Sequence, residues 1–434
     1  MKKMVLSLTC LSAIAFGQTS FAACPTGTSE RPSVTGKPAC ALTQKEYTNM
    51  TLTLTNGNDY LLETGVFIGG DNTNPASLVI QAGTKILGTE GAFIVISRGS
   101  KIVAQGTQAA PIVFTSKKLT DRKRGEWGGL VINGRAPINV CNGAGTCEAV
   151  SEGIKERTVK FGGADANDNS GVLKYVVVEF AGYEISKDNE LNGITFNAVG
   201  RGTTVENIQV HMNADDGIEF FGGTVNVKYA VLTANDDDSI DWDFGWTGKA
   251  QFLLALQADD KADNGIEADN LKSPMNASPR SNPTISNMTL VGGKNSGFGM
   301  LLRKGTGANL SNVIVTGFKK ACVNVDDEET FLNGGAGRGT AVTATGLRMS
   351  HSILSCTAAF DQKADDLWSI ESWFNAQAGN RVGNAGLSGY MPVAGSPALS
   401  GGVTPEDIFF DPVDYIGAFE TEDWTTGWTQ KSLK

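Results

Sequence analysis

Carboxylate side chains recur at regular spacing in the middle of this 434-residue chain. Three segments of seven residues align without a gap and begin 22 and then 26 residues apart: Ala214–Phe220 (ADDGIEF), Asp236–Trp242 (DDDSIDW) and Ala262–Ala268 (ADNGIEA). Aligned carboxylates can hold a hard cation such as calcium, or they can serve as a protonated acid beside an ionised base in glycoside hydrolysis. The spacing therefore indicates metal binding or acid–base chemistry, provided that the fold brings the segments together.

The three segments form part of a longer repeat. Glu190–Phe196 lies 24 residues before the first segment, and Asn295–Met300 follows the third with a loop between them. A period of this length indicates a solenoid, in which each repeat stacks on the previous one. Because the side chains of a strand alternate between its two faces, one column should point inward and the next outward. The inward column is Ile194, Ile218, Ile240 and Ile266, and the outward column is Thr195, Glu219, Asp241 and Glu267.

Short strands are predicted over most of the chain. Runs rich in Val, Ile and Thr, such as 78–87, 92–97 and 310–315, are separated by turns, and the chain contains 53 glycines. Two to three strands in a coil of about 22 residues are typical of a β-helix and not of a propeller blade. We therefore predict an all-β fold, a right-handed parallel β-helix (solenoid) with a small disulfide-tied N-terminal cap.

Both ends of the chain differ from the repeats. Residues 1–22 contain two lysines, an apolar stretch and a small-residue ending, which are typical of a secretory signal peptide. We expect an N-terminal cap at 24–58, the β-helix at 59–400, a C-terminal cap at 401–434 and a helix on the outer surface near 367–377. The protein is accordingly expected in the periplasm, on the outer cell surface or outside the cell.

Six of the seven cysteines remain after the signal peptide is removed. An even number in an exported chain favours disulfides. The spacing predicts the pairs Cys24–Cys40, Cys141–Cys147 and Cys322–Cys356. The alternative is a lipidated Cys24 at the mature N-terminus, which would leave Cys40 without a partner.

The charge distribution argues against two classes of partner. The formal net charge is −10, and residues 213–270 alone hold thirteen Asp or Glu against three Lys. Nucleic acids and anionic membranes attract basic surfaces, so neither is expected to bind. No segment after the signal peptide approaches the roughly eighteen apolar residues that a membrane-spanning helix needs.

Three motifs carry a family resemblance: Gly125–Ile138 (GEWGGLVINGRAPI), His211–Gly223 (HMNADDGIEFFGG) and Tyr415–Phe419 (YIGAF). With them the chain resembles, over nearly all of its mature length, a widespread family of uncharacterised exported bacterial proteins of pectin-lyase-like fold. The resemblance implies a parallel β-helix and export, and it brings no agreed activity. Residues 235–241 also look like one motif of polygalacturonase-type hydrolases, but Phe298 stands where those enzymes have a histidine, so their activity is not expected.

Stacked coils lie about 4.8 Å apart, so aligned carboxylates repel one another unless something compensates. A bound cation, shared protons or hydrogen bonds from turn amides can do so. Amide capping is the expected role of Asn213, Asn235 and Asp215. Calcium is the expected cofactor, and its candidate ligands are Asp215, Glu219, Asp238, Asp241, Asp243, Asp263, Glu267 and Asp269.

Two classes of function remain open. The first is a non-catalytic secreted or cell-surface protein that binds a polysaccharide or cell-surface glycan through an acidic, calcium-loaded face. The alternative is an enzyme, either a calcium-dependent polysaccharide lyase with Arg303 as its base or a glycoside hydrolase with paired carboxylates. The candidate catalytic residues are Asp237, Asp241, Glu267 and Arg303. The binding protein is the preferred hypothesis, because the motif set of the known hydrolases is incomplete.

Overall fold

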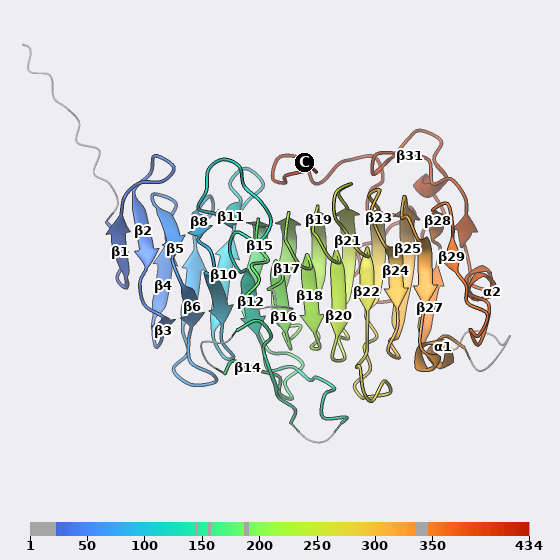
Figure 1. The fold of residues 1–434 in the computed structure, drawn as a ribbon, viewed down its shortest axis with the longest axis horizontal. Coiled ribbons are helices and arrows are strands. Elements are labelled where there is room, and N and C mark those ends of the chain that lie inside the picture. Colours follow the sequence, from blue (N-terminus) through green and yellow to red (C-terminus); the bar gives the residue numbers. More distant parts are fainter. Residues whose placement is uncertain (1–22, 144–145, 155–157, 186–190, 336–345, 434) are drawn as a thin grey trace, which may run out of the picture.

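The computed structural model describes residues 23–433 apart from 144–145, 155–157, 186–190 and 336–345. The predicted signal peptide at 1–22 lies outside the described residues. Figure 1 shows one elongated solenoid, in which the coils advance from the blue N-terminal strands towards the orange C-terminal ones. No helix among the described residues is long and apolar enough to cross a membrane.

Two sheets form the body of the solenoid, and nearly all of their strand pairs are parallel. Within the described ranges the larger sheet contains 17 strands: β1 (Thr28–Arg31), β2 (Ala39–Leu42), β4 (Thr51–Leu54), β5 (Asp59–Leu62), β7 (Ser77–Ile80), β8 (Lys85–Gly88), β10 (Lys101–Gln105), β11 (Ile112–Ser116), β15 (Gly171–Glu179), β17 (Thr204–His211), β19 (Val227–Thr233), β21 (Lys249–Leu256), β23 (Thr284–Val291), β25 (Ala308–Thr316), β27 (Leu347–Ser350), β28 (Ile353–Ser355) and β30 (Arg381–Val382). The smaller sheet contains 11 strands over the same ranges: β3 (Glu46–Tyr47), β6 (Gly65–Ile68), β9 (Phe93–Ile96), β12 (Leu130–Asn133), β16 (Ile194–Asn197), β18 (Ile218–Phe221), β20 (Ile240–Asp243), β22 (Ile266–Ala268), β24 (Phe298–Leu302), β26 (Ala321–Val325) and β29 (Phe360–Asp361). The prediction of a parallel β-helix is confirmed.

The remaining described elements are short. Two antiparallel pairs lie outside the main sheets, β13 (Ala149–Val150) with β14 (Lys160–Phe161), and β31 (Leu387–Ser388) with β32 (Met391–Pro392). The helices are α1 (Glu328–Gly334), α2 (Ile370–Asn375) and the 3-10 turn η1 (Pro397–Leu399).

Each coil turns a corner inside the larger sheet. In the early coils this sheet consists of two ladders, β4–β7–β10 and β5–β8–β11, and from β15 to β25 a single bent strand replaces them. The bend falls on a residue with positive φ, a conformation that is costly for most side chains and easier for Asn. These corner residues lie in register from coil to coil: Tyr175 (φ 48°), Asn207 (53°), Tyr229 (59°), Phe252 (62°), Asn287 (56°) and Asn312 (55°).

The interior contains the columns that the repeat predicts. All four isoleucines of the inward column are at most 2% exposed. A second inward column contains the aromatic residues Phe196, Phe220 and Trp242. Phe220 of this column stacks on the indole of Trp246, with ring centroids 3.9 Å apart. Such continuous burial of apolar side chains is the main favourable contribution to folding of a solenoid.

The outward face of the smaller sheet changes character along the axis. Its early outward residues Phe67, Val95 and Val131 are buried in a cluster with Ile154 and Val159 from an insertion between two coils. On the next coils, the residues in register with Val131 are Thr195 and then Glu219. The apolar cover therefore ends where the acidic residues begin.

The C-terminal end of the solenoid is closed by α2, which lies at that end in Figure 1. Ile370, Trp373 and Phe374 of this helix are buried in the same cluster as the coil interior. The helix expected on the outer surface at 367–377 is therefore an end cap instead. Its apolar face covers core side chains that the last coil would otherwise expose to water.

The parallel ladder begins before the predicted boundary at residue 59. Strand β2 already pairs in parallel with β5, and β3 pairs in parallel with β6. Within this N-terminal segment β1 is antiparallel to its neighbour β2, and the Cys24–Cys40 disulfide ties the segment before β1 to β2. The N-terminal cap is thus smaller than 24–58, because strands within that range belong to the first coils.

Residues 400–433, which we call the strap, do not form the C-terminal cap predicted at 401–434. The strap runs back along the outer surface of the larger sheet, with the C-terminus near the middle of the solenoid in Figure 1. Its backbone bonds the side chains of Asn312 on β25, Gln251 on β21 and Gln209 on β17. Trp428 of the strap packs in an apolar cluster with Val231 of the sheet. The strap is needed there because outward residues of the sheet are apolar and require cover.

Candidate functional site

The smaller sheet aligns acidic side chains on three consecutive strands. Glu219 on β18 lies opposite Asp241 on β20, which lies opposite Glu267 on β22. Neighbouring strands are about 4.8 Å apart, and the residues on either side of each acid point into the core. The column continues to Leu301 on β24, where its acidic part ends.

A second set of carboxylates lies in the turns that precede these strands. Asp216 is 7% exposed and Asp238 is 3% exposed. The carboxylate of Asp216 accepts a hydrogen bond from the backbone N–H of Asp238 (3.0 Å), and the carboxylate of Asp238 accepts one from the N–H of Asn264 (2.6 Å). Each turn is thereby attached to the next by a side-chain oxygen.

Asparagines attach the same turns to one another, as expected. Asn235 Oδ1 accepts a hydrogen bond from the backbone N–H of Asn213 (3.1 Å), and Asn213 Nδ2 donates to the carbonyl of Asp216 (2.7 Å). In the same turn Asp216, the residue after Asp215, accepts a backbone amide, and the capping role expected for Asp215 stays a prediction.

The turn and strand carboxylates meet in one compact cluster. Carboxylate oxygens of Asp216, Asp238 and Asp241 lie within 4.8 Å of one another. Two further triads within the same limit extend the cluster along the solenoid: Asp215–Asp216–Asp237 and Asp237–Asp238–Asp263. We call the whole set the acidic face; it comprises Asp215, Asp216, Glu219, Asp237, Asp238, Asp241, Asp263 and Glu267.

Burial and like charges disfavour ionisation of this cluster. Burial raises the pKa of Asp216 and that of Asp238 well above the ordinary range, and neighbouring carboxylates raise both further. The pKa of Asp241 is raised in the same way, first by burial and then by the charges of Glu219 and Glu267. Protons or a cation must therefore compensate part of the charge.

Arg303 lies after β24, beside the end of the acidic face. Its guanidinium binds the carboxylate of Glu267, and its Nε donates to Asp269 Oδ1 (2.8 Å). Burial acts to lower the pKa of Arg303, but the charges of Asp269 and Glu267 hold it above the usual value. Nearby, burial raises the pKa of Asp243 to about 7.

Arg124 is a residue of this region that sequence reasoning missed. Its Nε lies 3.0 Å from Asp236, and its Nη1 lies 2.9 Å from Asp260. The hydrogen bond from Arg124 lowers the pKa of Asp260 to about 2. Arg124 and Asp260 are separated by 136 residues, so no local pattern could have indicated the contact.

The structure brings most of the predicted metal ligands together. The triads include Asp215, Asp238, Asp241 and Asp263, and Glu219 and Glu267 flank Asp241 in register. Asp243 and Asp269 lie farther along, at strand ends, and Asp269 is bound by Arg303. Sequence reasoning omitted Asp216, although its alignment with Asp238 in the repeat could have identified it.

The four candidate catalytic residues lie on three consecutive coils. Asp237 is exposed in the turn before β20, while Asp241 and Glu267 face each other across neighbouring strands. This geometry suits a pair of carboxylates that share one proton. It does not suit Arg303 as a base, because two carboxylates stabilise the charged guanidinium.

The donor set of the acidic face fits calcium. Calcium accepts carboxylate oxygens in loose geometry, and three such residues contribute oxygens to the central triad. Asp216 and Asp238 each use one oxygen to accept a backbone amide, which leaves the second oxygen for a cation.

All three predicted disulfides are present: Cys24–Cys40, Cys141–Cys147 and Cys322–Cys356. The bond to Cys40 occupies the sulfur of Cys24, which the lipidation alternative requires to be free.

Comparison with known proteins agrees with the fold. A family model described as a pectate-lyase-like β-helix domain matches residues 45–429. No curated protein and no solved structure matches the chain.

Proposed function

The chain belongs to the pectate-lyase-like β-helix family, and on this premise we propose that it is an exported, non-catalytic protein that binds polysaccharide through the acidic face. In this proposal calcium lies between the carboxylates and links them to the acidic groups of a uronate-containing polymer. The three disulfides support export, because such bonds persist in oxidising compartments.

The observation that carries the proposal is the central triad of Asp216, Asp238 and Asp241. Its carboxylate oxygens lie within 4.8 Å of one another, and two of the three residues are almost fully buried. Backbone capping uses one oxygen of Asp216 and one of Asp238, and it does not involve the strand position of Asp241. A divalent cation would remove the repulsion and fill the remaining coordination sites with ligand oxygens.

The position of Arg303 favours binding over elimination chemistry. A lyase needs a base that removes the proton beside a uronate carboxylate. Arg303 is held by Glu267 and Asp269, and their charges keep its pKa above the usual value. An arginine that neighbouring carboxylates hold in its charged form is poorly suited to this step.

A second candidate, an acid-pair glycoside hydrolase, has one observation in its favour. Asp241 and Glu267 lie opposite each other on neighbouring strands, and burial raises the pKa of both. One carboxyl of such a pair can remain protonated as the acid while the other is ionised as base or nucleophile.

A calcium titration followed by thermal unfolding tests the cation. A ligand that binds only the folded state at about 100 times its Kd stabilises it by roughly 2.7 kcal/mol. We expect a rise of several degrees in the Tm of the mature protein, and no rise in Asp216→Asn/Asp241→Asn. Glu420→Gln is the control for loss of an exposed charge and should respond as wild type. An unchanged Tm of the wild type at millimolar calcium would remove calcium from the proposal.

Binding and cleavage are separated by incubating the protein with polygalacturonate in calcium or in EDTA. We expect calcium-dependent retention on the polymer that Asp241→Asn/Glu267→Gln weakens, with no unsaturated product and no new reducing ends. Reducing ends that disappear in the same double variant would replace the binding function with hydrolysis. Unsaturated products would replace it with a lyase.

A further inference from the structure

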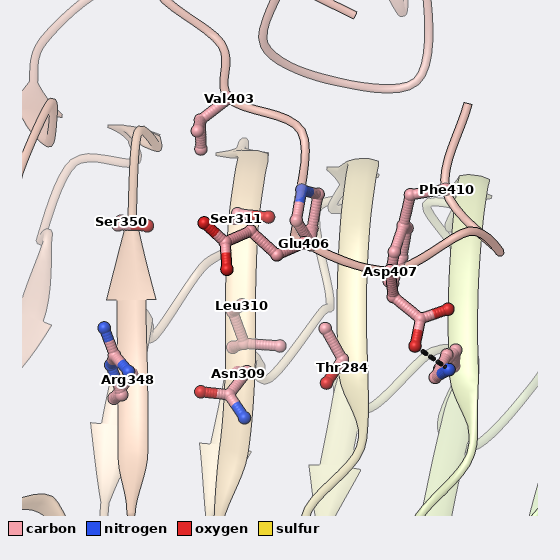
Figure 2. Close-up of a pocket in the computed structure, with 12 residues that line it drawn as sticks. Thr284, Asn309, Leu310, Ser311, Arg348, Ser350, Val403, Glu406, Asp407 and Phe410 are labelled. Carbon is pink, nitrogen blue, oxygen red and sulfur yellow. Dashed lines mark hydrogen bonds and ion pairs between the residues drawn. The ribbon is translucent and has the colours of Figure 1, made fainter. Parts of the chain in front are cut away.

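A polar groove lies on the larger sheet, between the outer surface of the coils and the strap. It has a volume of about 470 Å³. Its floor comes from β21, β23, β25 and β27, and its wall comes from Val403–Phe410 of the strap. The residues that line it include Lys249, Thr284, Asn309, Arg348, Glu406 and Asp407. Figure 2 shows the row of floor side chains with the strap passing beside it.

The floor is a ladder of hydrogen-bonding side chains in strict register. Lys249 pairs with Thr284, and Thr284 pairs with Asn309. Asn309 in turn pairs with Arg348. Because coils repeat about every 4.8 Å, the four side chains present donors or acceptors at equal intervals over roughly 14 Å. A ligand that uses the whole ladder must itself repeat along its length.

The inner edge of the groove carries hydroxyl groups. Ser311 and Ser350 pair with each other two residues after Asn309 and Arg348, so they form a second row parallel to the first. Ser311 Oγ donates to Ser286 Oγ (3.0 Å), which fixes its orientation within the sheet. Figure 2 places both serines between the floor and the strap.

The wall is fixed to the sheet at both ends. Asn312 bonds Val403 twice, from Nδ2 to the carbonyl (2.7 Å) and from the backbone N–H of Val403 to Oδ1 (2.9 Å). At the other end Lys249 forms an ion pair with Asp407. A preformed wall lowers the entropic cost of binding, because no segment has to be ordered when the ligand arrives.

The groove has balanced charge. Two cations of the floor, Lys249 and Arg348, are matched by Glu406 and Asp407 of the wall. The whole chain carries a net charge of −10, so where no cation is bound its field also repels polyanions. A neutral polymer is not repelled by this field and needs no excess of positive charge in the groove. If it has many hydroxyls, each hydroxyl can both donate to an amide or carboxylate oxygen and accept from an amino or guanidinium group.

We propose that this groove binds a neutral sugar chain. The chain lies along the solenoid axis, so that each coil contacts one repeating unit of the polymer. This site is separate from the acidic face, needs no calcium, and would give the protein two carbohydrate surfaces of different charge. It stands on the ladder and the strap alone and does not depend on the function proposed above.

Titration calorimetry with cellohexaose, xylohexaose and maltohexaose tests the groove, using the mature protein in EDTA. We expect at least one of the three to bind. Asn309→Trp, which fills the floor, and Asn309→Ala/Arg348→Ala, which removes hydrogen bonds without adding bulk, should each weaken that binding at least tenfold. Thr204→Trp is the matched control, because Thr204 is the exposed outward residue at the start of β17, outside the groove. It should bind as wild type.

The outcomes distinguish the two carbohydrate surfaces. Absence of binding to all three hexasaccharides would overturn the groove and leave the acidic face untouched. Binding that survives both Asn309 variants, or that Asp241→Asn/Glu267→Gln abolishes, would also overturn it, because the ligand would then lie elsewhere. Thermal unfolding of every variant verifies that lost binding does not reflect lost folding, and Asn309→Ala/Arg348→Ala serves if the tryptophan variant is unstable.

Discussion

The guanidinium of Arg303 forms ion pairs with the carboxylates of Glu267 and Asp269 and compensates their negative charges. Replacement by alanine leaves the half-buried Glu267 and Asp269 without their ion-pair partner. We expect Arg303→Ala to lower the free energy of unfolding by about 2 kcal/mol at pH 7, measured by urea denaturation. The loss should shrink as the pH falls towards 4, because burial raises the pKa of Glu267 and of Asp269 and protonation removes the charge that Arg303 compensates. Lys294→Ala, which breaks an exposed pair with Asp259, should cost less than about 0.5 kcal/mol. Equal losses in the two variants would contradict this role of burial.

His211 is a buried residue whose protonation should make stability depend on pH. It is 3% exposed, and its Nδ1 lies 2.8 Å from Thr233 Oγ1. Burial, with Arg122 and Arg124 nearby, lowers the pKa of His211 from 6.5 to about 4. Below pH 6.5 the unfolded chain therefore binds a proton at this histidine that the folded protein does not bind until the pH approaches 4. The free energy of unfolding falls as the pH drops from 6.5 towards 4.

His211→Gln cannot take up that proton, so we expect it to remove up to about 3 kcal/mol of the stability change between pH 7 and pH 4. Urea denaturation at each pH, in EDTA, measures the slope. His351→Gln is the control for the same exchange at the other histidine of the chain. A His211→Gln slope equal to that of wild type would show that His211 does not control this pH range.

Single residues of the acidic face could be predicted from the sequence because the repeat is gapless. Alignment of the segments places Asp241 beside Glu267, and the structure pairs these two residues. The contacts of Arg124 could not be predicted, since they join loops 136 residues apart. Amide capping by Asp216 also depends on which side chain the turn buries, and spacing alone does not show this.

At the scale of elements, the corners of β17, β23 and β25 combine a costly backbone conformation with an asparagine side chain. Asn287 has φ 56°, and its Nδ2 donates to the strap carbonyls of Tyr415 (3.2 Å) and Gly417 (3.1 Å). We expect Asn287→Ala to lower the free energy of unfolding by about 2–3 kcal/mol, because it loses buried hydrogen bonds and the side chain that tolerates positive φ.

Asn207→Ala is the matched control for that corner. Asn207 occupies the same position of another coil with φ 53°, so its replacement tests the backbone preference alone. It should cost about 1 kcal/mol. If urea denaturation gives the same loss for both variants, the strap contacts of Asn287 contribute nothing to stability.

Strands were predictable, and the elements that cover them were not. The inward and outward columns follow from local alternation, which every coil repeats. The positions of α2 and the strap depend instead on distant contacts, such as the one between Gln209 and Gln430, 221 residues apart. A short apolar helix and a tryptophan-rich tail must both bury their apolar side chains. The sequence does not show whether they do so at an end of the solenoid or on one of its sides.

For the whole molecule, the strap and the solenoid core are separate hydrophobic units. Among the described residues, the main core cluster contains none after Phe374, whereas Trp428 packs with Val177 and Val231 in a cluster on the outer surface of the larger sheet. Removal of residues 420–434 should therefore leave the β-helix folded and expose an apolar surface. We expect unchanged far-UV circular dichroism, new binding of a hydrophobic dye, and a loss of roughly 4 kcal/mol in the free energy of unfolding.

The same truncation separates the two roles of the strap. Its wall at Val403–Phe410 is held by Asn312 and Lys249, and neither contact involves the removed residues. Binding of the neutral hexasaccharide should therefore persist in the truncated protein at temperatures where it is folded, although the protein is less stable and more prone to associate. Trp428→Ala provides a milder version that exposes part of the same surface. If the truncated chain loses its β-sheet signal altogether, the strap is an integral part of the folding unit and the solenoid does not fold without it.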